Sequence, residues 1–133
     1  MGTLTALGMT GPTVLLGGCG GLHYVAARTE GSRLEIEVAE LEPGGAGYVA
    51  APGLDRPIYV HRTARGSYAA VLAECTHRRC IPEPAGERLV CPCHGSEFTL
   101  AGQVLEGPAE RDLPTFRVEA QGPLLIIETG GLG

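Results

Sequence analysis

The sequence predicts an all-β fold, built as an antiparallel sandwich or a small barrel. Short runs of strand-forming residues recur at intervals of roughly 8 to 12 residues. These runs are bounded by glycine or proline, of which the chain has 21 and 10. After residue 31 no stretch keeps the period of about 3.6 residues that marks an amphipathic helix. With 133 residues, the chain has room for one domain with one modest core.

The clearest strand is predicted at residues 34–38, where Leu34, Ile36 and Val38 alternate with two glutamates. This period of two places the apolar side chains on one face of the strand and the charged ones on the other. Further strands are predicted, in chain order, at residues 58–62, 67–73, 88–90, 97–100, 103–106, 115–119 and 124–128.

The charge balance excludes one class of partner. The chain carries 15 acidic and 10 basic side chains, which gives a formal net charge of −5 at pH 7. Nucleic-acid binding requires a basic surface that this composition does not provide, so we expect no nucleic-acid partner.

The N-terminal region differs from the rest of the chain, because the first charged side chain is Arg28. The region is long enough to span a bilayer, but seven glycines and Pro12 make it a poor transmembrane helix. Residues 13–19, T-V-L-L-G-G-C, resemble a bacterial lipobox, which makes Cys19 a candidate lipid anchor. The basic start of an export signal is missing. We therefore predict an uncharged anchor or leader at 1–31 and the folded domain at 32–133.

Potential metal ligands are concentrated in two short segments, C-T-H at residues 75–77 and C-P-C-H at residues 91–94. The remaining histidines, His23 and His61, have no such neighbours, so we expect them to be ordinary surface or strand residues. A structural zinc site needs four ligands of mixed sulfur and nitrogen type. One such set is Cys75, Cys80, Cys91 and His94.

A cluster of two irons uses the two segments more evenly than zinc does. Each segment offers at least one cysteine and one histidine, so one iron can take two thiolates and the other two imidazoles. On this interpretation Cys75 and Cys91 bind the first iron, and His77 and His94 bind the second.

The strings C-T-H-R-R-C at residues 75–80 and C-P-C-H-G-S-E-F at residues 91–98 resemble the two cluster-binding boxes of the Rieske iron–sulfur proteins. The resemblance is to the disulfide-containing, high-potential type of cytochrome bc complexes. It implies the Rieske fold, an antiparallel β-sandwich with a small cluster-binding subdomain formed by two loops within residues 74–98. It also implies one [2Fe-2S] cluster, a disulfide between Cys80 and Cys93, and a proline loop at residues 107–109.

The resemblance also suggests roles for the residues around the cluster. Ser96 matches a serine whose hydroxyl donates to a bridging sulfide, and Pro108 lies in the proline loop. Phe98 stands where many high-potential members have a tyrosine that donates to a cysteine sulfur. Arg78 and Arg79 replace the usual Leu-Gly pair, so we predict a positive tip that docks an acidic partner face.

We therefore expect electron transfer through the cluster, as the iron–sulfur subunit of a quinol:cytochrome c oxidoreductase of the bc type. Two alternatives are the small Rieske subunit of an arsenite-oxidase-type molybdenum oxidoreductase and a structural zinc-binding domain. The expected partners are cytochrome b- or c-type subunits or another redox subunit, with quinol at the cluster tip. Because disulfides persist outside the cytosol, the predicted location is the periplasmic face of a bacterial membrane, with residues 1–31 as the anchor.

Overall fold

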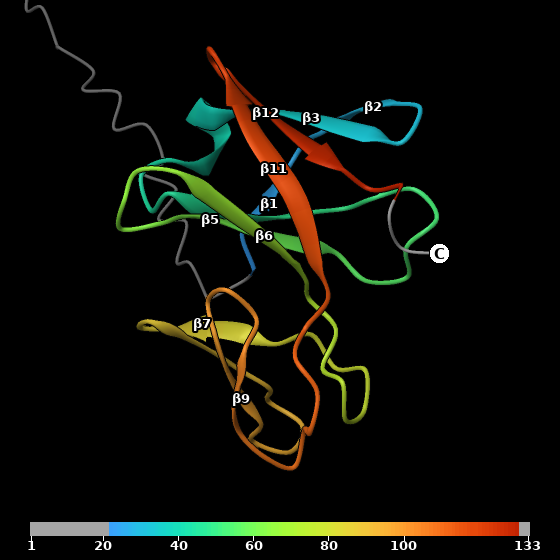
Figure 1. The fold of residues 1–133 in the computed structure, drawn as a ribbon, viewed down its shortest axis with the longest axis vertical. Coiled ribbons are helices and arrows are strands. Elements are labelled where there is room, and N and C mark those ends of the chain that lie inside the picture. Colours follow the sequence, from blue (N-terminus) through green and yellow to red (C-terminus); the bar gives the residue numbers. More distant parts are fainter. Residues whose placement is uncertain (1–21, 131–133) are drawn as a thin grey trace, which may run out of the picture.

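The structure, a computed structural model, describes residues 22–130 as two sheets joined end to end (Figure 1). The large sheet contains β1 (Tyr24–Val25), β2 (Arg28–Glu30), β3 (Arg33–Glu37), β4 (Ala46–Val49), β5 (Ile58–Arg62), β6 (Tyr68–Leu72), β11 (Thr115–Gln121) and β12 (Leu124–Glu128). The small sheet contains β7 (Glu83–Ala85), β8 (Arg88–Val90), β9 (Glu97–Thr99) and β10 (Val104–Glu106). The helical element in this part of the chain is the 3-10 turn η1 (Val38–Leu41).

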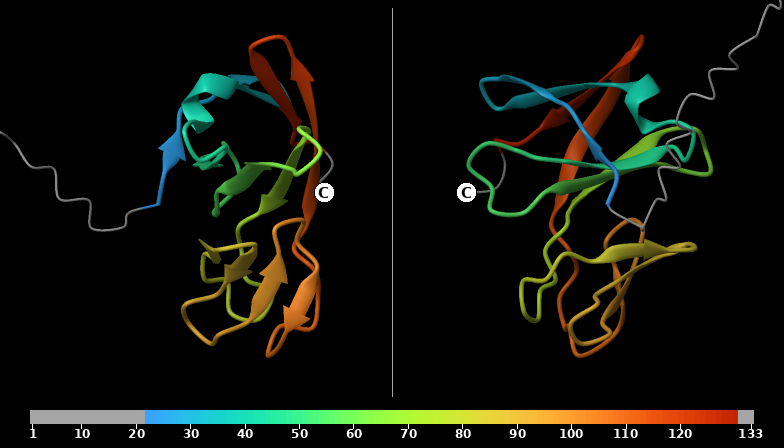
Figure 2. Two further views of the ribbon diagram at one scale, coloured as in Figure 1. Left: turned by 90° about the vertical axis from the view of Figure 1, so that its left-hand side faces the viewer. Right: turned by 180° about the vertical axis from the view of Figure 1, so that it is seen from behind.

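The large sheet curls around its core because β11 belongs to both of its halves. Its strand order is β1-β4-β5-β6-β11-β12-β3-β2. Thr115 and Phe116 of β11 pair with β6, whereas the rest of the strand pairs with β12. The two halves therefore face each other, as the views in Figure 2 show. Between them lies the apolar core of Val25, Leu34, Ile36, Leu41, Val49, Ala51, Ile58, Val60, Ala70, Phe116, Leu125 and Ile127.

The sequence pattern predicts eight of the twelve strands in residues 22–130 and misses four. β5, β8 and β12 have the predicted bounds, and β3 buries Leu34 and Ile36 as the alternation requires. The strands that are not predicted, of two to four residues each, are β1, β2, β4 and β7. In β4, Gly47 allows close packing, because a Cβ there would lie 3.1 Å from Val25 and 3.2 Å from Leu41.

The sheet begins earlier than the predicted boundary at residue 31. β1 pairs in parallel with β4, and β2 pairs with β3. Val25 is buried in the core, so this part of the chain contributes to folding. Cys19 lies outside the described residues. In residues 22–130 no helix is long and apolar enough to cross a membrane.

The small sheet is inserted between β6 and β11, and a second apolar core attaches it to the large sheet. Leu89 of β8 and Phe98 of β9 pack in this core with Tyr48, Tyr59 and Val71 of the large sheet. The two free cysteines among the described residues, Cys75 and Cys91, lie in the same core. The junction between the sheets thus becomes the floor of the site described below.

His61 is a buried histidine within the large sheet and gives a test of the fold. It is 7% exposed and stacks on Tyr59, with the ring centroids 5.9 Å apart. Its Nδ1 has no hydrogen-bond partner among the described residues. Burial lowers the pKa of His61, so folding favours the neutral ring.

We expect the His61→Phe variant to lose less stability on acidification than the wild type. A histidine whose pKa is lower in the folded state stabilises the fold above its unfolded pKa of about 6.5 and loses this contribution as the pH falls through the folded pKa. Phenylalanine keeps the stack but cannot titrate. Urea unfolding from about pH 8 to pH 5 measures the effect, with His23→Phe as the control at an exposed histidine. Equal acid sensitivity of His61→Phe and wild type would contradict the prediction.

Candidate metal centre

Two loops at the free end of the small sheet share one backbone framework. In the first loop, residues 75–80, the N–H of Cys75 donates to the carbonyl of Cys80 and the N–H of Arg79 donates to the carbonyl of Cys75, both at 2.8 Å. In the second loop, residues 91–96, the N–H of Cys91 donates to Ser96 at 2.8 Å and that of Gly95 to Cys91 at 2.9 Å. The fifth residue of each loop has a positive φ, +60° at Arg79 and +78° at Gly95.

Each loop buries one cysteine and exposes one histidine. Cys75 and Cys91 are each 1% exposed, and neither forms a disulfide. His77 and His94 are exposed, and their ring centroids lie 4.9 Å apart at an angle of 83°. The structure thus brings together the four predicted iron ligands, two sulfurs toward the core and two imidazoles toward solvent.

Backbone donors surround the two sulfurs. Burial by itself raises the pKa of the Cys75 thiol, but hydrogen bonds from the backbone N–H groups of His77 and Arg78 and from neighbouring side chains outweigh it, so this pKa is lowered. Burial raises the pKa of Cys91, and the adjacent Cys75 sulfur adds to the effect, although the N–H groups of Cys93 and His94 oppose it. Such N–H groups stabilise thiolate ligands in an apolar setting.

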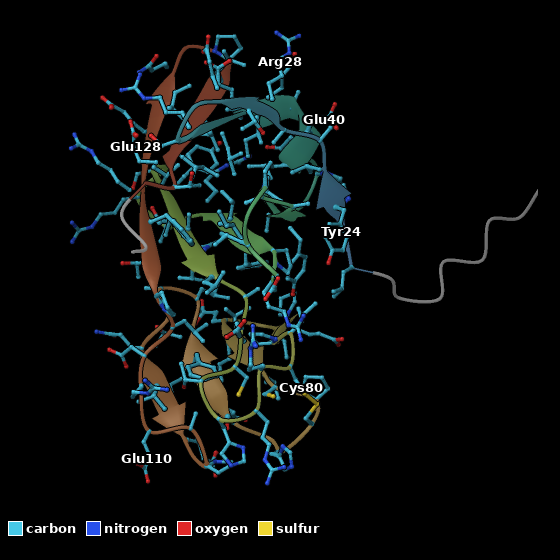
Figure 3. The ribbon with its side chains drawn as sticks, turned by 90° about the vertical axis from the view of Figure 1, so that its right-hand side faces the viewer. Tyr24, Arg28, Glu40, Cys80, Glu110 and Glu128 are labelled. Atoms are coloured by element: carbon cyan, nitrogen blue, oxygen red, sulfur yellow. A yellow bond between two sulfur atoms is a disulfide. The ribbon has the colours of Figure 1, made fainter. Side chains whose placement is uncertain are left out.

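A disulfide between Cys80 and Cys93 joins the two loops, as the resemblance implies (Figure 3). The two Cα atoms are 6.4 Å apart, within the range that a disulfide spans. The sulfurs of Cys80, Cys91 and Cys93 lie within 4.8 Å of one another, but the disulfide removes two of them as metal ligands. The zinc set that includes Cys80 is wrong for the same reason.

The proline loop reaches the site through Ser96. The N–H of Ala109, which follows Pro108, donates to the Ser96 Oγ at 3.0 Å. Ser96 is 0% exposed, and its hydroxyl helps to lower the pKa of the Cys75 thiol. Because Ala109 occupies a lone pair of the hydroxyl oxygen, the hydroxyl proton remains available for the sulfur side.

The structure separates the two arginines that the sequence predicts as one positive tip. Arg78 is exposed and forms no ion pair within residues 22–130, whereas Arg79 contacts two carboxylates. Its Nη2 lies 3.3 Å from Asp55, and its Nε lies 3.2 Å from Glu74. Among the described residues, Arg78 is therefore an unpaired positive charge directly next to His77 in the chain.

Sequence reasoning missed the residues that hold the loops from a distance. The Tyr48 hydroxyl donates to the carbonyl of Pro82 at 2.7 Å, although the two residues are 34 positions apart. Burial raises the pKa of Tyr48, which keeps this hydroxyl protonated. The Thr76 hydroxyl donates to the carbonyl of Arg111 at 2.7 Å. Nothing in the local sequence marks these residues, because their partners come from other elements.

The residues present fit a [2Fe-2S] cluster held by two cysteines and two histidines. The thiols of Cys75 and Cys91 lie next to each other, are buried, and accept hydrogen bonds from backbone N–H groups. The imidazoles come one from each loop and face each other. This mixed donor set suits a centre in which one iron has sulfur ligands and the other has nitrogen ligands.

Comparisons with known proteins point the same way. Residues 34–117 match the Rieske [2Fe-2S] domain family. The chain is 30% identical over 98 residues to the cytochrome b6-f complex iron-sulfur subunit of Chlorobaculum tepidum, covering 72% of this chain and 53% of that protein. It is 30% identical over 124 residues to the mitochondrial cytochrome b-c1 complex subunit Rieske-3 of Nicotiana tabacum, with coverages of 70% and 46%. The chain thus spans about half the length of the curated relatives it matches.

Solved structures extend the comparison to the fold. The plasma membrane Rieske protein PetC3 from Synechocystis PCC 6803 matches with a TM-score of 0.62 and 35% identity, covering 69% of this chain and 94% of that one. A chain from the complex of oxygenase and ferredoxin in carbazole 1,9a-dioxygenase gives a TM-score of 0.64 at 23% identity, with coverages of 75% and 95%. At that identity the second likeness shows the fold alone. The all-β fold expected from the sequence is confirmed.

Phe98 gives a test of how the site sets its reduction potential. The side chain is 0% exposed and packs in the core that contains Cys75 and Cys91. We expect Phe98→Tyr to raise the potential by about 40 to 60 mV, since a hydroxyl that donates to a ligand sulfur favours the more negative, reduced state. Potentiometric titration checks this, with Phe116→Tyr in the other core as the control. A potential that does not rise would mean that position 98 does not face a ligand sulfur.

Proposed function

Because this chain belongs to the Rieske [2Fe-2S] family, we propose that it transfers electrons as the iron–sulfur subunit of a quinol:cytochrome c oxidoreductase of the bc type. The observation that carries the proposal is the arrangement of two disulfide-linked loops, each with a buried cysteine and an exposed histidine. The likeness to subunits of cytochrome b6-f and b-c1 complexes supports the same assignment. The cofactor is one [2Fe-2S] cluster.

The proposed ligands divide the site into a dry side and a wet side. Cys75 and Cys91 would hold one iron from the apolar side, where the core excludes water from the sulfurs. His77 and His94 would hold the other iron from the exposed side. The cluster, when bound, accepts and returns one electron at a time. The ring nitrogen of each histidine that does not bind iron would remain free to form a hydrogen bond.

The exposed imidazole rings of His77 and His94 would let a quinol bind close to the cluster. Each proposed ligand histidine leaves one ring nitrogen able to hydrogen-bond with a quinol hydroxyl. A cluster bound at this site would accept the electron next to the ring that holds the quinol hydroxyl. We therefore place the quinol contact at the rings of His77 and His94.

The proposed location is the outer face of a bacterial membrane. The disulfide between Cys80 and Cys93 favours an oxidising compartment. The likeness to a plasma membrane Rieske protein supports membrane association, and the uncharged sequence of residues 1–21, before the first strand, offers an anchor. Under this proposal the exposed histidines face cytochrome partners at the membrane surface.

Metal and sulfide analysis of anaerobically purified protein tests the cluster. We expect about two irons and two acid-labile sulfides per chain, as a cluster of this type requires. His77→Ser and His94→Ser should each abolish the characteristic absorption and paramagnetic resonance spectra, because a hydroxyl is a poor substitute for imidazole on this iron. His23→Ser, at a histidine outside both loops, serves as the control and should keep the spectra. Protein that contains zinc and no labile sulfide would contradict the assignment of a [2Fe-2S] cluster.

Purification with the native partners tests the proposed complex. We expect subunits carrying b-type and c-type haem to accompany the protein from native membranes. Quinol should then reduce the bound subunit, and a specific quinol-site inhibitor should prevent it. A molybdenum-containing subunit in place of the cytochromes would instead assign the protein to the arsenite-oxidase type.

Arg78 gives a test of partner docking. It lies next to His77, is exposed and forms no ion pair among the described residues. We expect Arg78→Glu to slow electron transfer to an acidic partner several-fold at low salt and less at high salt, since salt screens the interaction. Arg28→Glu provides the control, because Figure 3 shows Arg28 at the end opposite Cys80. Equal rates for Arg78→Glu and wild type at both salt concentrations would remove Arg78 from the docking surface.

A further inference from the structure

Arg79 occupies a backbone position that suits glycine. Its φ of +60° is the one positive value at a non-glycine residue in the described range 22–130. The second loop has Gly95, with φ +78°, at the equivalent point of the same hydrogen-bond framework. A side chain makes the left-handed conformation unfavourable, whereas glycine adopts it freely. The first loop therefore retains an arginine at a local cost in free energy.

The side chain of Arg79 bridges two carboxylates from different parts of the chain. Its Nε donates to Glu74 Oε1 at 3.2 Å and its Nη2 to Glu74 Oε2 at 3.3 Å. The same Nη2 donates to Asp55 Oδ2 at 3.3 Å. Glu74 directly precedes the buried Cys75, and Asp55 lies in the connection between β4 and β5 of the large sheet. The guanidinium thus links the first loop to the large sheet.

The main chain of Arg79 makes a contact to the same region of the large sheet. The Nε of Arg56 donates to the carbonyl of Arg79 at 2.7 Å. Residues 55 and 56 therefore hold both ends of Arg79, one through its side chain and the other through its backbone. Networks of this kind hold a loop better than isolated exposed ion pairs do, because the ordering of each side chain serves more than one contact.

We propose that Arg79 is a positioning residue that braces the first cluster loop against the large sheet through Asp55 and Glu74. The brace fixes the loop that presents His77, because Arg79, next to the disulfide-bonded Cys80, is tied to Glu74 at the start of the loop. It also compensates the charge of the Glu74 carboxylate, which directly precedes the proposed cluster ligand Cys75. This inference rests on the cluster ligation proposed above, which the iron and sulfide analysis tests separately.

Hydrogen exchange in the cluster-loaded protein tests the mechanical part of the proposal. We expect Arg79→Gly to speed amide exchange in the segment 74–80 by about two- to fivefold, as loss of a small ion-pair network would. Asp55→Asn should act in the same direction, and the double variant should show less than the product of the two effects. Arg78→Gly is the matched control and should leave exchange unchanged. Exchange in Arg79→Gly at or below the wild-type rate would overturn the brace, because relief of the strained φ would then be the only effect.

The reduction potential tests the electrostatic part. Removal of the Arg79 charge leaves the Glu74 carboxylate uncompensated near Cys75, so Arg79→Gly should have a lower potential than wild type. Adding Glu74→Gln restores the net charge and should return the potential toward wild type, while loop exchange stays fast. A loosened loop alone would not regain its potential on loss of a carboxylate. A potential in Arg79→Gly equal to that of wild type would overturn the electrostatic role.

Discussion

The apolar core between the two sheets is the constraint on which the site depends. Leu89 and Phe98 of the small sheet pack there against Tyr59 and Val71 of the large sheet. Full burial of a leucine or phenylalanine side chain contributes about 1.5 to 3 kcal/mol, so a few such residues hold the small sheet in place. The same core surrounds two thiols that iron can bind. An unpaired thiolate in this environment would be costly, which is why backbone N–H donors gather around each sulfur.

Polar contacts and the disulfide then fix the parts of the two cluster loops that the apolar core does not hold. The core positions the base of each loop, but it does not reach the exposed tips. The disulfide joins the end of the first loop, at Cys80, to Cys93 of the second loop. Tyr48 holds the segment after the first loop, and Ala109 orients the Ser96 hydroxyl. Each contact joins segments far apart in the chain, so the geometry of the site is a property of the whole fold.

The division between a dry base and a wet tip explains how one small domain can serve electron transfer. The sulfurs of Cys75 and Cys91 lie in the core, shielded from water. The exposed rings of His77 and His94 remain within reach of a partner. On a protein with a net charge of −5, the unpaired charge of Arg78 beside His77 also distinguishes this end of the molecule. An acidic partner surface would recognise that end in preference to the rest.

The amino-acid sequence alone determined the chemistry of the site and the long strands. Cysteine and histidine types at close spacing specify a mixed sulfur and nitrogen donor set, and alternation over several residues specifies which face of β3 is buried. Only the tertiary structure decided how neighbouring residues differ in role. Arg78 and Arg79 are equivalent in sequence, yet Arg79 meets Asp55 from a strand connection 24 positions away. Short strands such as β1 were equally hidden, because two residues carry no period and pair only when the rest of the sheet has formed. Local pattern reports local preference, whereas long-range pairing depends on which segments the folded chain brings together.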